Sequence, residues 1–305
     1  MVRPLAPGAA IAVVAPAGPL PPTTYAEGLN ILRARYTLRH QHPMDLAPDL
    51  APNFGLPYLA ASDEARATTF NAAMRDDEVE AVLCARGGYG SARILADLDA
   101  ATLERRRVPL VGFSDITAIH AWAASFGVPT VHGPVVNQLS VLPQGDREAL
   151  FALLEGEQTT TFEGLDCWHP GTAEGAIFGG NLAVLASLCG TPYLPRPQGK
   201  IFFFEEVNEP AYRLDRYLTQ LLQAGALEGI VGVVIGDLQG CPAAETTLRK
   251  LLAPLSIPVV AQLPSGHGQR NRAFWLSTPA MLDGDTGSLQ VDAPKRAPTS
   301  QTPKK

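Results

Sequence analysis

The stretch Val108-Pro-Leu-Val-Gly-Phe-Ser-Asp-Ile-Thr117 runs from a short apolar segment straight into a helical pattern. A buried strand followed at once by a helix is the geometry of a nucleophile elbow, in which a tight turn holds one side chain above the sheet edge. Ser114 would be that side chain. The Asp115 amide at the helix N-terminus would face the oxyanion that forms when Ser114 Oγ attacks a carbonyl carbon. The alternative is a Ser N-cap with Asp in the first turn, which is common, and the motif lacks the last glycine of GxSxG.

The segments around this stretch alternate between strand and helix patterns. In the first half we expect strands at residues 11–15, 79–85, 108–112 and 128–132, and helices at 62–75 and 115–126. In the second half we expect strands at 173–178, 200–205 and 230–235, helices at 182–189, 211–224 and 246–255, and a hairpin at 281–291. The fold class is therefore α/β, with an N-terminal flavodoxin- or Rossmann-like, mostly parallel sheet and a smaller mixed α/β C-terminal domain with a barrel-like sheet.

The chain of 305 residues is long enough for two domains. The pattern lapses at 158–170, which we expect to be the linker between an N-terminal domain at 1–157 and a C-terminal domain at 171–292. Residues 293–305 are polar, proline-rich and basic, and we expect them to be disordered. The N-terminus superficially resembles a signal peptide, but Pro4, Pro7 and Gly8 would break its helix, and we favour a short buried strand at 11–15.

Composition excludes several classes of protein. The formal charge is −6 and 46% of the residues are hydrophobic, which argues against a disordered chain and against a nucleic-acid partner. No apolar run approaches the length of a membrane span. The four cysteines form no CxxC pair and no HExxH motif is present, so we expect neither a metal nor another cofactor, and free thiols in a reducing, cytoplasmic compartment.

A glycine-rich segment, Ala85-Arg-Gly-Gly-Tyr-Gly-Ser-Ala-Arg93, follows the strand expected at 79–85. Glycines at 87, 88 and 90 would let the backbone approach a ligand closely, and ligands of open α/β sheets bind at the carboxyl ends of strands. The segment lacks the third glycine of a dinucleotide fingerprint and the GK[ST] of a P-loop. We interpret it as an oxyanion or carboxylate loop with Arg86 as a cation for a substrate carboxylate; a structural turn is the alternative.

Two segments of the second half carry candidate acid and base groups. The apolar strand at 200–205 ends in Glu205-Glu206, and a carboxylate at the end of a buried strand needs a partner such as an imidazolium. The second segment, Gly266-His267-Gly268, would present a single imidazole from a flexible loop. Among the other histidines, His132 at a strand end is the rival to His267.

Taken together, the motifs resemble those of the LD-carboxypeptidases, a family of serine peptidases. The resemblance runs from about residue 7 to residue 292. The matching motifs, in chain order, are Asp63-Glu-Ala-Arg66, Arg86-Gly-Gly-Tyr-Gly90, Gly112-Phe-Ser-Asp115, His132-Gly-Pro134, Gly179-Gly-Asn-Leu182, Phe204-Glu-Glu-Val-Asn-Glu-Pro-Ala-Tyr-Arg-Leu-Asp-Arg216 and Gly266-His267.

This resemblance implies a Ser–His–Glu triad of Ser114, His267 and Glu205, split across two domains, with oxyanion donors at Gly88 and Asp115. It implies a cytoplasmic homodimer that needs no metal and has a small peptide as its partner. The implied reaction removes the terminal D-Ala from L-Ala-γ-D-Glu-meso-diaminopimelate-D-Ala in murein recycling. Within the matched motifs, the candidate substrate-binding residues are Arg86, Tyr89 and Asn181.

The sequence also departs from the family pattern. Glu206 stands where the family usually has Asp, so the choice between Glu205 and Glu206 depends on residue alternation, since only one of the two can face a cleft. Two other functions stay open. One is a related immunity peptidase that cleaves an acyl-amide in a peptidyl antibiotic, and the other is a non-catalytic two-domain ligand binder.

Overall fold

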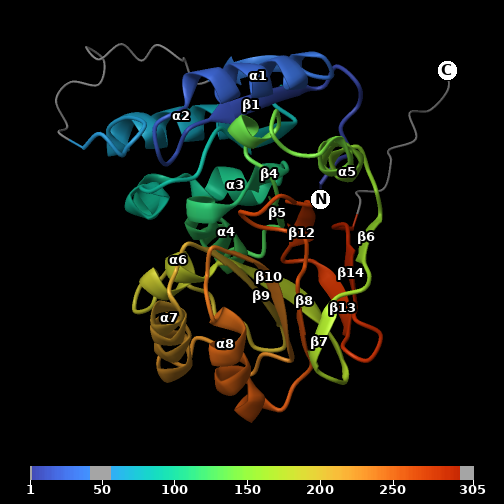
Figure 1. Cartoon of the computed structure of the whole chain (residues 1–305). Coiled ribbons are helices and arrows are strands. Elements are labelled where there is room, and N and C mark those ends of the chain that lie inside the picture. The colour runs from blue at the N-terminus through green and yellow to red at the C-terminus, as the bar shows by residue number, and fades with distance from the viewer. Residues whose placement is uncertain (1, 42–55, 296–305) are drawn as a thin grey trace.

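The structure is a computed structural model that describes residues 2–41 and 56–295. Its strands form a six-stranded sheet in the upper part of Figure 1 and an eight-stranded sheet in the lower part. His42 and most of the tail expected to be disordered, residues 296–305, lie outside the described residues. Below, the N-terminal half means residues 2–157 and the C-terminal half means residues 158–295.

The six-stranded sheet has a flavodoxin-like order. Its strands are β1 (Ala10–Val14), β2 (Thr37–Gln41), β3 (Ala81–Cys84), β4 (Leu110–Gly112), β5 (Thr130–His132) and β12 (Phe274–Leu276). They run in the order β12-β5-β4-β3-β1-β2, with β12 antiparallel to β5 and the others parallel. The strand order reverses between β1 and β3, and ligands of such sheets bind beyond the carboxyl ends of the strands at this point. The predicted α/β class is confirmed.

The helices of the N-terminal half follow the predicted alternation. They are α1 (Pro22–Arg33), α2 (Asp63–Arg75), α3 (Ala100–Arg106), α4 (Thr117–Ser125) and α5 (Gln144–Leu154), with short 3-10 helices η1 (Ser91–Asp97), η2 (Ser114–Ile116) and η3 (Val136–Gln138). The Ser62 side chain accepts a hydrogen bond from the Ala65 amide at 3.1 Å and so caps the N-terminus of α2. All four residues of β3 are buried, as expected for a central parallel strand covered on both faces.

The eight-stranded sheet has a parallel centre and antiparallel flanks. Its strands are β6 (Thr159–Phe162), β7 (Asp166–His169), β8 (Thr172–Asn181), β9 (Ile201–Val207), β10 (Gly232–Gln239), β11 (Val259–Ala261), β13 (Pro279–Asp283) and β14 (Ser288–Asp292). Their order is β6-β14-β13-β8-β9-β10-β11-β7, and β13 and β14 form the predicted hairpin. The helices are α6 (Leu182–Ser187), α7 (Ala211–Gln223), α8 (Ala244–Leu252) and the 3-10 helix η4 (Ala253–Leu255). Among the described residues β6 and β7 do not pair with each other, so barrel-like closure is not confirmed.

The segment 158–170, expected to be a linker, forms strands β6 and β7 at the two edges of the eight-stranded sheet. In β6 the side chains of Thr160 and Phe162 are buried while Thr159 is exposed, which is the alternation of a strand with one covered face. The threonine-rich composition is therefore that of an edge strand of the eight-stranded sheet. The division of the chain into domains at 157 and 171 stays a prediction.

The two halves share their hydrophobic cores. One cluster of buried side chains contains Phe113 of the N-terminal half together with Phe178 and Leu214 of the C-terminal half, and the other joins Leu83 to Phe203. Strand β12 adds to this by crossing from the C-terminal half into the six-stranded sheet. Within the part of the chain that the structure describes, no helix has the length and apolar character needed to cross a membrane.

Candidate active site

Ser114 stands at a strained turn between β4 and α4. Its φ is +62°, a conformation that costs a non-glycine residue about 1–3 kcal/mol and is common at functional sites. Gly112 permits the close turn, because an added Cβ there would lie 2.7 Å from Cγ2 of Ile116. Phe113, not Ser114, occupies the N-cap position of η2 and makes no side-chain capping bond. The turn therefore has the shape of the predicted nucleophile elbow rather than that of an ordinary serine cap.

The side chain of Asp115 joins this elbow to the glycine-rich loop after β3. Its buried Oδ2 accepts a hydrogen bond from the Ser91 amide at 2.8 Å, and the Ser91 hydroxyl donates to the Asp115 carbonyl at 2.5 Å. Burial raises the pKa of Asp115, and the hydrogen bonds from Ser91 oppose that shift. This pairing fixes the elbow and the loop relative to each other.

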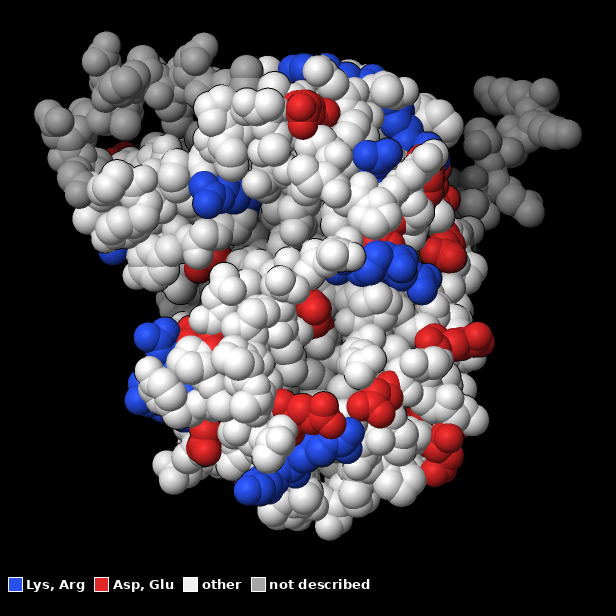
Figure 2. Space-filling model, viewed as in Figure 1, with Lys and Arg blue, Asp and Glu red and all other residues white. Residues whose placement is uncertain are grey.

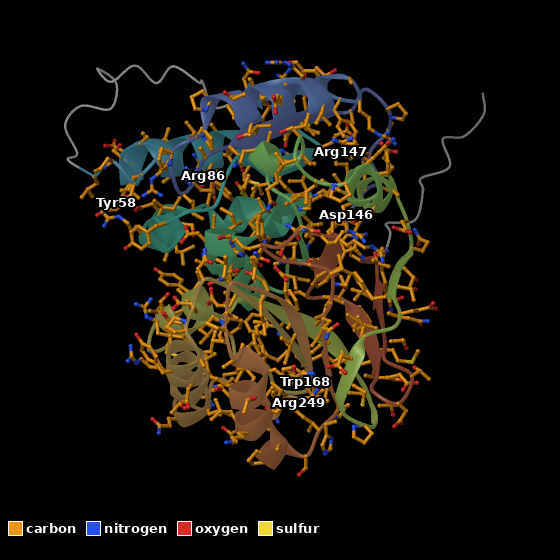
Figure 3. The ribbon with its side chains drawn as sticks, viewed as in Figure 1. Tyr58, Arg86, Asp146, Arg147, Trp168 and Arg249 are labelled. Carbon is orange, nitrogen blue, oxygen red and sulfur yellow. The ribbon has the colours of Figure 1, made fainter. Side chains whose placement is uncertain are left out.

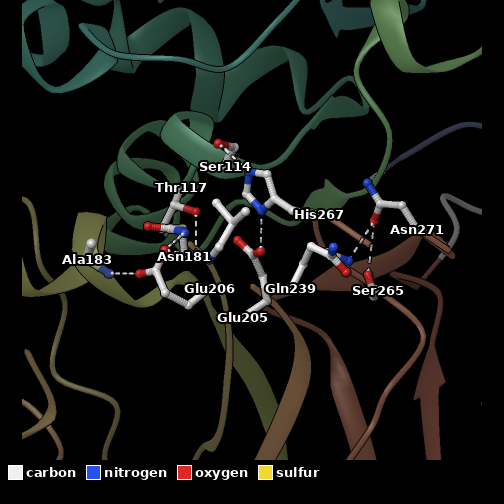
Figure 4. A network of polar contacts seen from close by, with 12 residues as sticks. Ser114, Thr117, Asn181, Ala183, Glu205, Glu206, Gln239, Ser265, His267 and Asn271 are labelled. Atoms are coloured by element: carbon white, nitrogen blue, oxygen red, sulfur yellow. Dashed lines mark hydrogen bonds and ion pairs between the residues drawn. The ribbon is translucent and has the colours of Figure 1, made fainter. Parts of the chain in front are cut away.

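His267 lies between Ser114 and Glu205, as Figure 4 shows. Its Nε2 is 3.0 Å from Oγ of Ser114, and its Nδ1 is 2.6 Å from Oε2 of the fully buried Glu205 on β9. Burial alone would lower the pKa of His267, but the hydrogen bond and charge of Glu205 outweigh it, so the pKa is raised above its ordinary value. The three side chains can therefore transfer a proton from the hydroxyl to an imidazole whose cation is stabilised.

Glu205 and Glu206 point to opposite sides of β9, as residue alternation predicts. Glu206 accepts hydrogen bonds from the Ala183 amide at 2.8 Å and from Nδ2 of Asn181 at 2.9 Å, at the N-terminus of α6. Asn181 also caps α6 by accepting the Val184 amide at 3.1 Å. Its side chain is buried and engaged in these bonds, so Asn181 supports the start of α6, and a contact with substrate stays a prediction.

The glycine-rich loop after β3 approaches the Ser114 side chain. An added Cβ at Gly87 would lie 2.9 Å from Cβ and 3.1 Å from Oγ of Ser114, so only glycine leaves this space open. Gly88 has a φ of +105°. Among the described residues, the amides of Gly88 and Asp115 have no hydrogen-bond acceptor. The sequence pointed to a close backbone approach at Gly87, but not to its contact with Ser114, because that contact crosses the sheet edge.

Arg86 and Tyr89 flank these glycines at the rim of the site. The half-buried Arg86 guanidinium donates a hydrogen bond to the carbonyl of Pro19, and Figure 3 shows it beneath α1 and α2. Tyr89 is 50% exposed and its ring meets that of Tyr58 edge to face, with centroids 5.7 Å apart. Both residues lie on the loop that leads to Ser114, but neither makes a contact that assigns it a ligand.

Sequence profiles match most of this chain. That of the LD-carboxypeptidase N-terminal domain matches residues 11–133, and that of the LD-carboxypeptidase C-terminal domain matches residues 174–282. The chain belongs to the LD-carboxypeptidase family. The family resemblance inferred from the motifs is thus confirmed, and the matched ranges contain Ser114, Glu205 and His267.

Two curated relatives cover three quarters or more of the chain. A putative carboxypeptidase of Streptomyces coelicolor is 41% identical, over 96% of this chain and 97% of its own. The murein tetrapeptide carboxypeptidase of Pseudomonas aeruginosa is 35% identical over 75% of this chain and 80% of its own.

Solved structures have the same fold. The muramoyltetrapeptide carboxypeptidase of Oxalobacter formigenes has a TM-score of 0.81 at 28% identity, covering 93% of this chain and 98% of its own. The microcin C7 self-immunity protein in complex with aspartyl sulfamoyl adenosine has a TM-score of 0.85, covering 96% and 98% of the two chains, and its 19% identity supports a likeness of fold alone.

Two other histidines, His120 and His132, are buried behind the Ser114 turn. His132, the rival to His267, packs against Phe203 and Phe274, and neither ring nitrogen has a hydrogen-bond partner among the described residues. Burial lowers its pKa well below the ordinary value, so the ring is neutral. His120 hydrogen-bonds the Gly112 carbonyl at 2.9 Å, and burial lowers its pKa to about 4. These two rings support the elbow from behind.

A cavity of about 770 Å³ lies beside the His267 loop, and sequence reasoning did not predict it. Its wall includes Trp168, Asp237, Gln239, Glu245, Gln262 and Arg270. Asp237 follows the apolar run of β10 just as Glu205 follows the apolar residues 201–204 of β9, so the same rule of strand-end carboxylates could have found it. Burial and the neighbouring Glu205 raise the pKa of Asp237. Figure 2 shows a face hollowed near its middle, with acidic and basic side chains beside the hollow.

Two further groups of side chains concern possible metal sites and the cysteines. Within residues 2–41 and 56–295, no group of three or more His, Cys, Asp and Glu side chains could hold a metal ion. All four cysteines are free thiols, and Cys84 and Cys241 are buried.

Proposed function

We propose that this LD-carboxypeptidase is a serine peptidase that removes the C-terminal D-Ala from the murein tetrapeptide L-Ala-γ-D-Glu-meso-diaminopimelate-D-Ala. The main support is the chain of hydrogen bonds from Oγ of Ser114 through the His267 ring to the buried Glu205. The murein tetrapeptide carboxypeptidase from Pseudomonas aeruginosa, 35% identical, supports the substrate class.

The reaction uses the three side chains in turn. His267 Nε2 takes the Ser114 proton while Oγ forms a bond to the carbonyl carbon that precedes D-Ala, and the carbonyl π electrons move to oxygen. Glu205 accepts a hydrogen bond from the Nδ1–H group of His267 and stabilises the imidazolium. The C–N bond then breaks, and His267 gives the proton to the leaving D-Ala amine. Water, deprotonated by His267, hydrolyses the resulting acyl-enzyme.

The oxyanion of the tetrahedral intermediate is held by backbone amides in this proposal. The donors are the amide of Gly88, next to Gly87 in the chain, and that of Asp115, whose nitrogen would lie 3.4 Å from a Cβ added at Gly87. Losing one such donor costs about 100- to 1000-fold in kcat. Arg86 and Tyr89 at the rim are candidates for holding the free carboxylate of the terminal residue and the adjacent chain.

Two further properties follow from family membership and need their own measurements. We propose that the protein works in the cytoplasm and as a homodimer, without a metal or other cofactor. Light scattering coupled to gel filtration tests the dimer, and undiminished activity in a chelator is the result expected for a metal-independent reaction.

A second candidate function is favoured by the cavity beside the His267 loop. Trp168, which we expected in a linker, contributes to its wall, and the Arg249 guanidinium stacks on its ring at 4.4 Å. Trp275, in contrast, is buried in β12. Trp168 gives the cavity an aromatic surface that suits a nucleotide-like group. Cleavage of an acyl-amide in a peptidyl antibiotic, with the same Ser114 chemistry, is therefore the alternative.

One experiment separates these functions. The protein is incubated with the murein tetrapeptide, and separately with aspartyl sulfamoyl adenosine, and mass spectrometry follows the release of D-Ala or of aspartate. Release of D-Ala supports the leading proposal, and release of aspartate alone supports the immunity-type reaction. Binding of either compound without cleavage would indicate the non-catalytic binder.

A further inference from the structure

The loop that carries His267, residues 262–273 between β11 and β12, is fastened to the N-terminal half by a buried carboxylate. Asp146, in the first turn of α5, is fully buried. It accepts hydrogen bonds from Nε of Arg270 at 2.9 Å, from Nη2 of Arg270 at 2.6 Å, and from the Asn271 amide at 3.0 Å. Figure 3 shows Asp146 where α5 approaches the C-terminal half.

Asn271 extends this attachment to the residues next to His267. Its Oδ1 accepts the Ser265 hydroxyl at 3.2 Å and the Gly266 amide at 3.3 Å, as Figure 4 shows for Ser265. Its Nδ2 donates to Oε1 of Gln138 on η3 at 3.1 Å. Asn271 is fully buried, so these bonds are shielded from water. Asp146 and Gln138 thus hold the loop from the N-terminal half at residues 270 and 271. Asn271 in turn holds Ser265 and Gly266, the two residues just before the histidine.

The other side of the same loop is attached to the eight-stranded sheet. The Ser265 carbonyl accepts the Asp237 amide at 3.0 Å, and the Leu263 amide donates to the Ile235 carbonyl at 3.1 Å. Of the ion pairs among the described residues, Asp146–Arg270 is the one that joins the N-terminal half to the C-terminal half. The nucleophile and its base are therefore placed relative to each other through a loop bonded to both halves.

We infer that Asp146 is a positioning residue, which sets the distance from His267 Nε2 to Ser114 Oγ by holding Arg270 and the Asn271 amide. This inference rests on the proposed function, in which His267 takes the proton of Ser114. Asp146 touches neither of those side chains, so it acts through the loop. A misplacement of about 1 Å between reacting groups costs on the order of 100-fold in rate.

The variant Asp146→Asn tests the inference with little risk of unfolding. Asparagine keeps the shape of the side chain but replaces one accepting oxygen by a donor, so Arg270 and the Asn271 amide cannot both be held. Arg270 is 51% exposed, so its charge stays hydrated when the carboxylate is lost. The reverse change, Arg270→Gln, leaves the buried Asp146 carboxylate without a cation. That variant should therefore unfold more easily than Asp146→Asn.

Glu155→Gln is the matched control. Glu155 follows the same helix, α5, and binds the Arg35 guanidinium through two hydrogen bonds of 2.5 and 2.7 Å. Both partners lie in the N-terminal half and away from the His267 loop. For Asp146→Asn we expect kcat to fall about 10- to 100-fold with KM within about threefold. Glu155→Gln should keep kcat within about twofold of the wild type, even if its Tm falls as much as that of Asp146→Asn.

A double variant and a substrate-independent measurement complete the test. Asp146→Asn with Arg270→Gln should have the kcat of the worse single variant rather than the product of both losses, because the two residues act as one unit. The ¹⁵N and proton NMR signals of the His267 imidazole report its bond to Glu205 without any substrate. In Asp146→Asn we expect that signal to broaden or split.

The outcomes distinguish this inference from the proposed function. If the wild type cleaves no peptide but the imidazole signal changes in Asp146→Asn, the proposed function fails and the positioning role stands. The inference is overturned if kcat and the imidazole signal of Asp146→Asn match those of the wild type. It is also overturned if Glu155→Gln loses as much kcat at an equal loss of Tm.

Discussion

The two halves of the molecule supply the active site in different ways. The N-terminal half presents Ser114 through a purely local device: a strand, a glycine and a residue with φ of +62° within five positions. The C-terminal half presents Glu205 and His267 from β9 and from the loop after β11, which are 62 residues apart in the chain. The first arrangement depends on backbone conformation, and the second depends on which strands pair.

This difference explains what each half can tolerate. Ser114 keeps its place as long as the elbow folds, because its neighbours in the chain impose the turn. His267 keeps its place only while the loop is bonded both to β10 and, through Asp146 and Asn271, to the N-terminal half. Substitutions at the elbow should therefore change the position of Ser114 alone. Substitutions in the loop should change the distance between His267 and Ser114, which come from different halves.

Removing the nucleophile should have the largest effect. Ser114→Ala should lower kcat about a million-fold, because the whole triad acts through this oxygen. Release of D-Ala measured by mass spectrometry checks it, and Ser140→Ala is the control, since the Ser140 hydroxyl has no hydrogen-bond partner among the described residues. Release at the wild-type rate by Ser114→Ala would end the proposed mechanism.

The two adjacent glutamates, Glu205 and Glu206, should differ in the effect of their substitution. Glu205→Gln should lower kcat about 10,000-fold, because the imidazole loses the anion that orients it and stabilises its cation. Glu206→Gln removes a carboxylate from the α6 N-terminus and should instead cost about 0.5–2 kcal/mol in the free energy of unfolding, with kcat little changed. Kinetics and urea denaturation measure the two effects, and a reversed pattern would mean that the two roles are exchanged.

A smaller loss is expected from filling the space beside the nucleophile. Gly87→Ala places a methyl group 3.1 Å from Oγ of Ser114, which should lower kcat/KM about 100-fold by displacing the attacked carbonyl. Gly145→Ala is the matched control, since an added Cβ at that helical position meets nothing within 4 Å and alanine favours a helix. Equal activity of both variants would show that Gly87 does not face the substrate.

The smallest effect is a displacement of the acid limb of the pH profile. Burial lowers the pKa of His267, but Glu205, Glu206 and Asp237 raise it by more, so the pKa is above its ordinary value of about 6.5. Because the base must be neutral, kcat/KM of the wild type should fall as the pH drops through this raised pKa. NMR titration of the imidazole should give a lower pKa in Glu205→Gln, and an unchanged value would remove Glu205 as the cause.

The same raised pKa predicts the sign of the effect on stability. The protonated His267 pairs with Glu205 in the folded protein, so this pair stabilises the fold below the ordinary pKa of histidine. The contribution is lost as the pH rises through the raised pKa. In Glu205→Gln this part of the pH dependence of stability should disappear.

Local sequence patterns predicted the elbow, the glycine-rich loop and the strand-end acid, because each depends on a few consecutive residues. They did not predict that Thr160 and Phe162 lie in a strand, since an edge strand is recognised by its partner, β14. The placement of β12 beside β5 and the contacts of Asp146 with Arg270 and Asn271 join positions more than 120 residues apart. Such contacts follow from the assembled sheets, and no spacing within one segment encodes them.

Strand β12 also determines how the chain can be divided. It pairs with β5, so a fragment that ends at residue 157 would leave the backbone groups of β5 unpaired at the edge of its sheet. The remaining fragment would carry Phe274 and Trp275 without the sheet that covers them. The two parts recognised by separate sequence profiles are therefore not separate in folding: the first sheet is completed by a strand of the second part, and that strand is covered by the first.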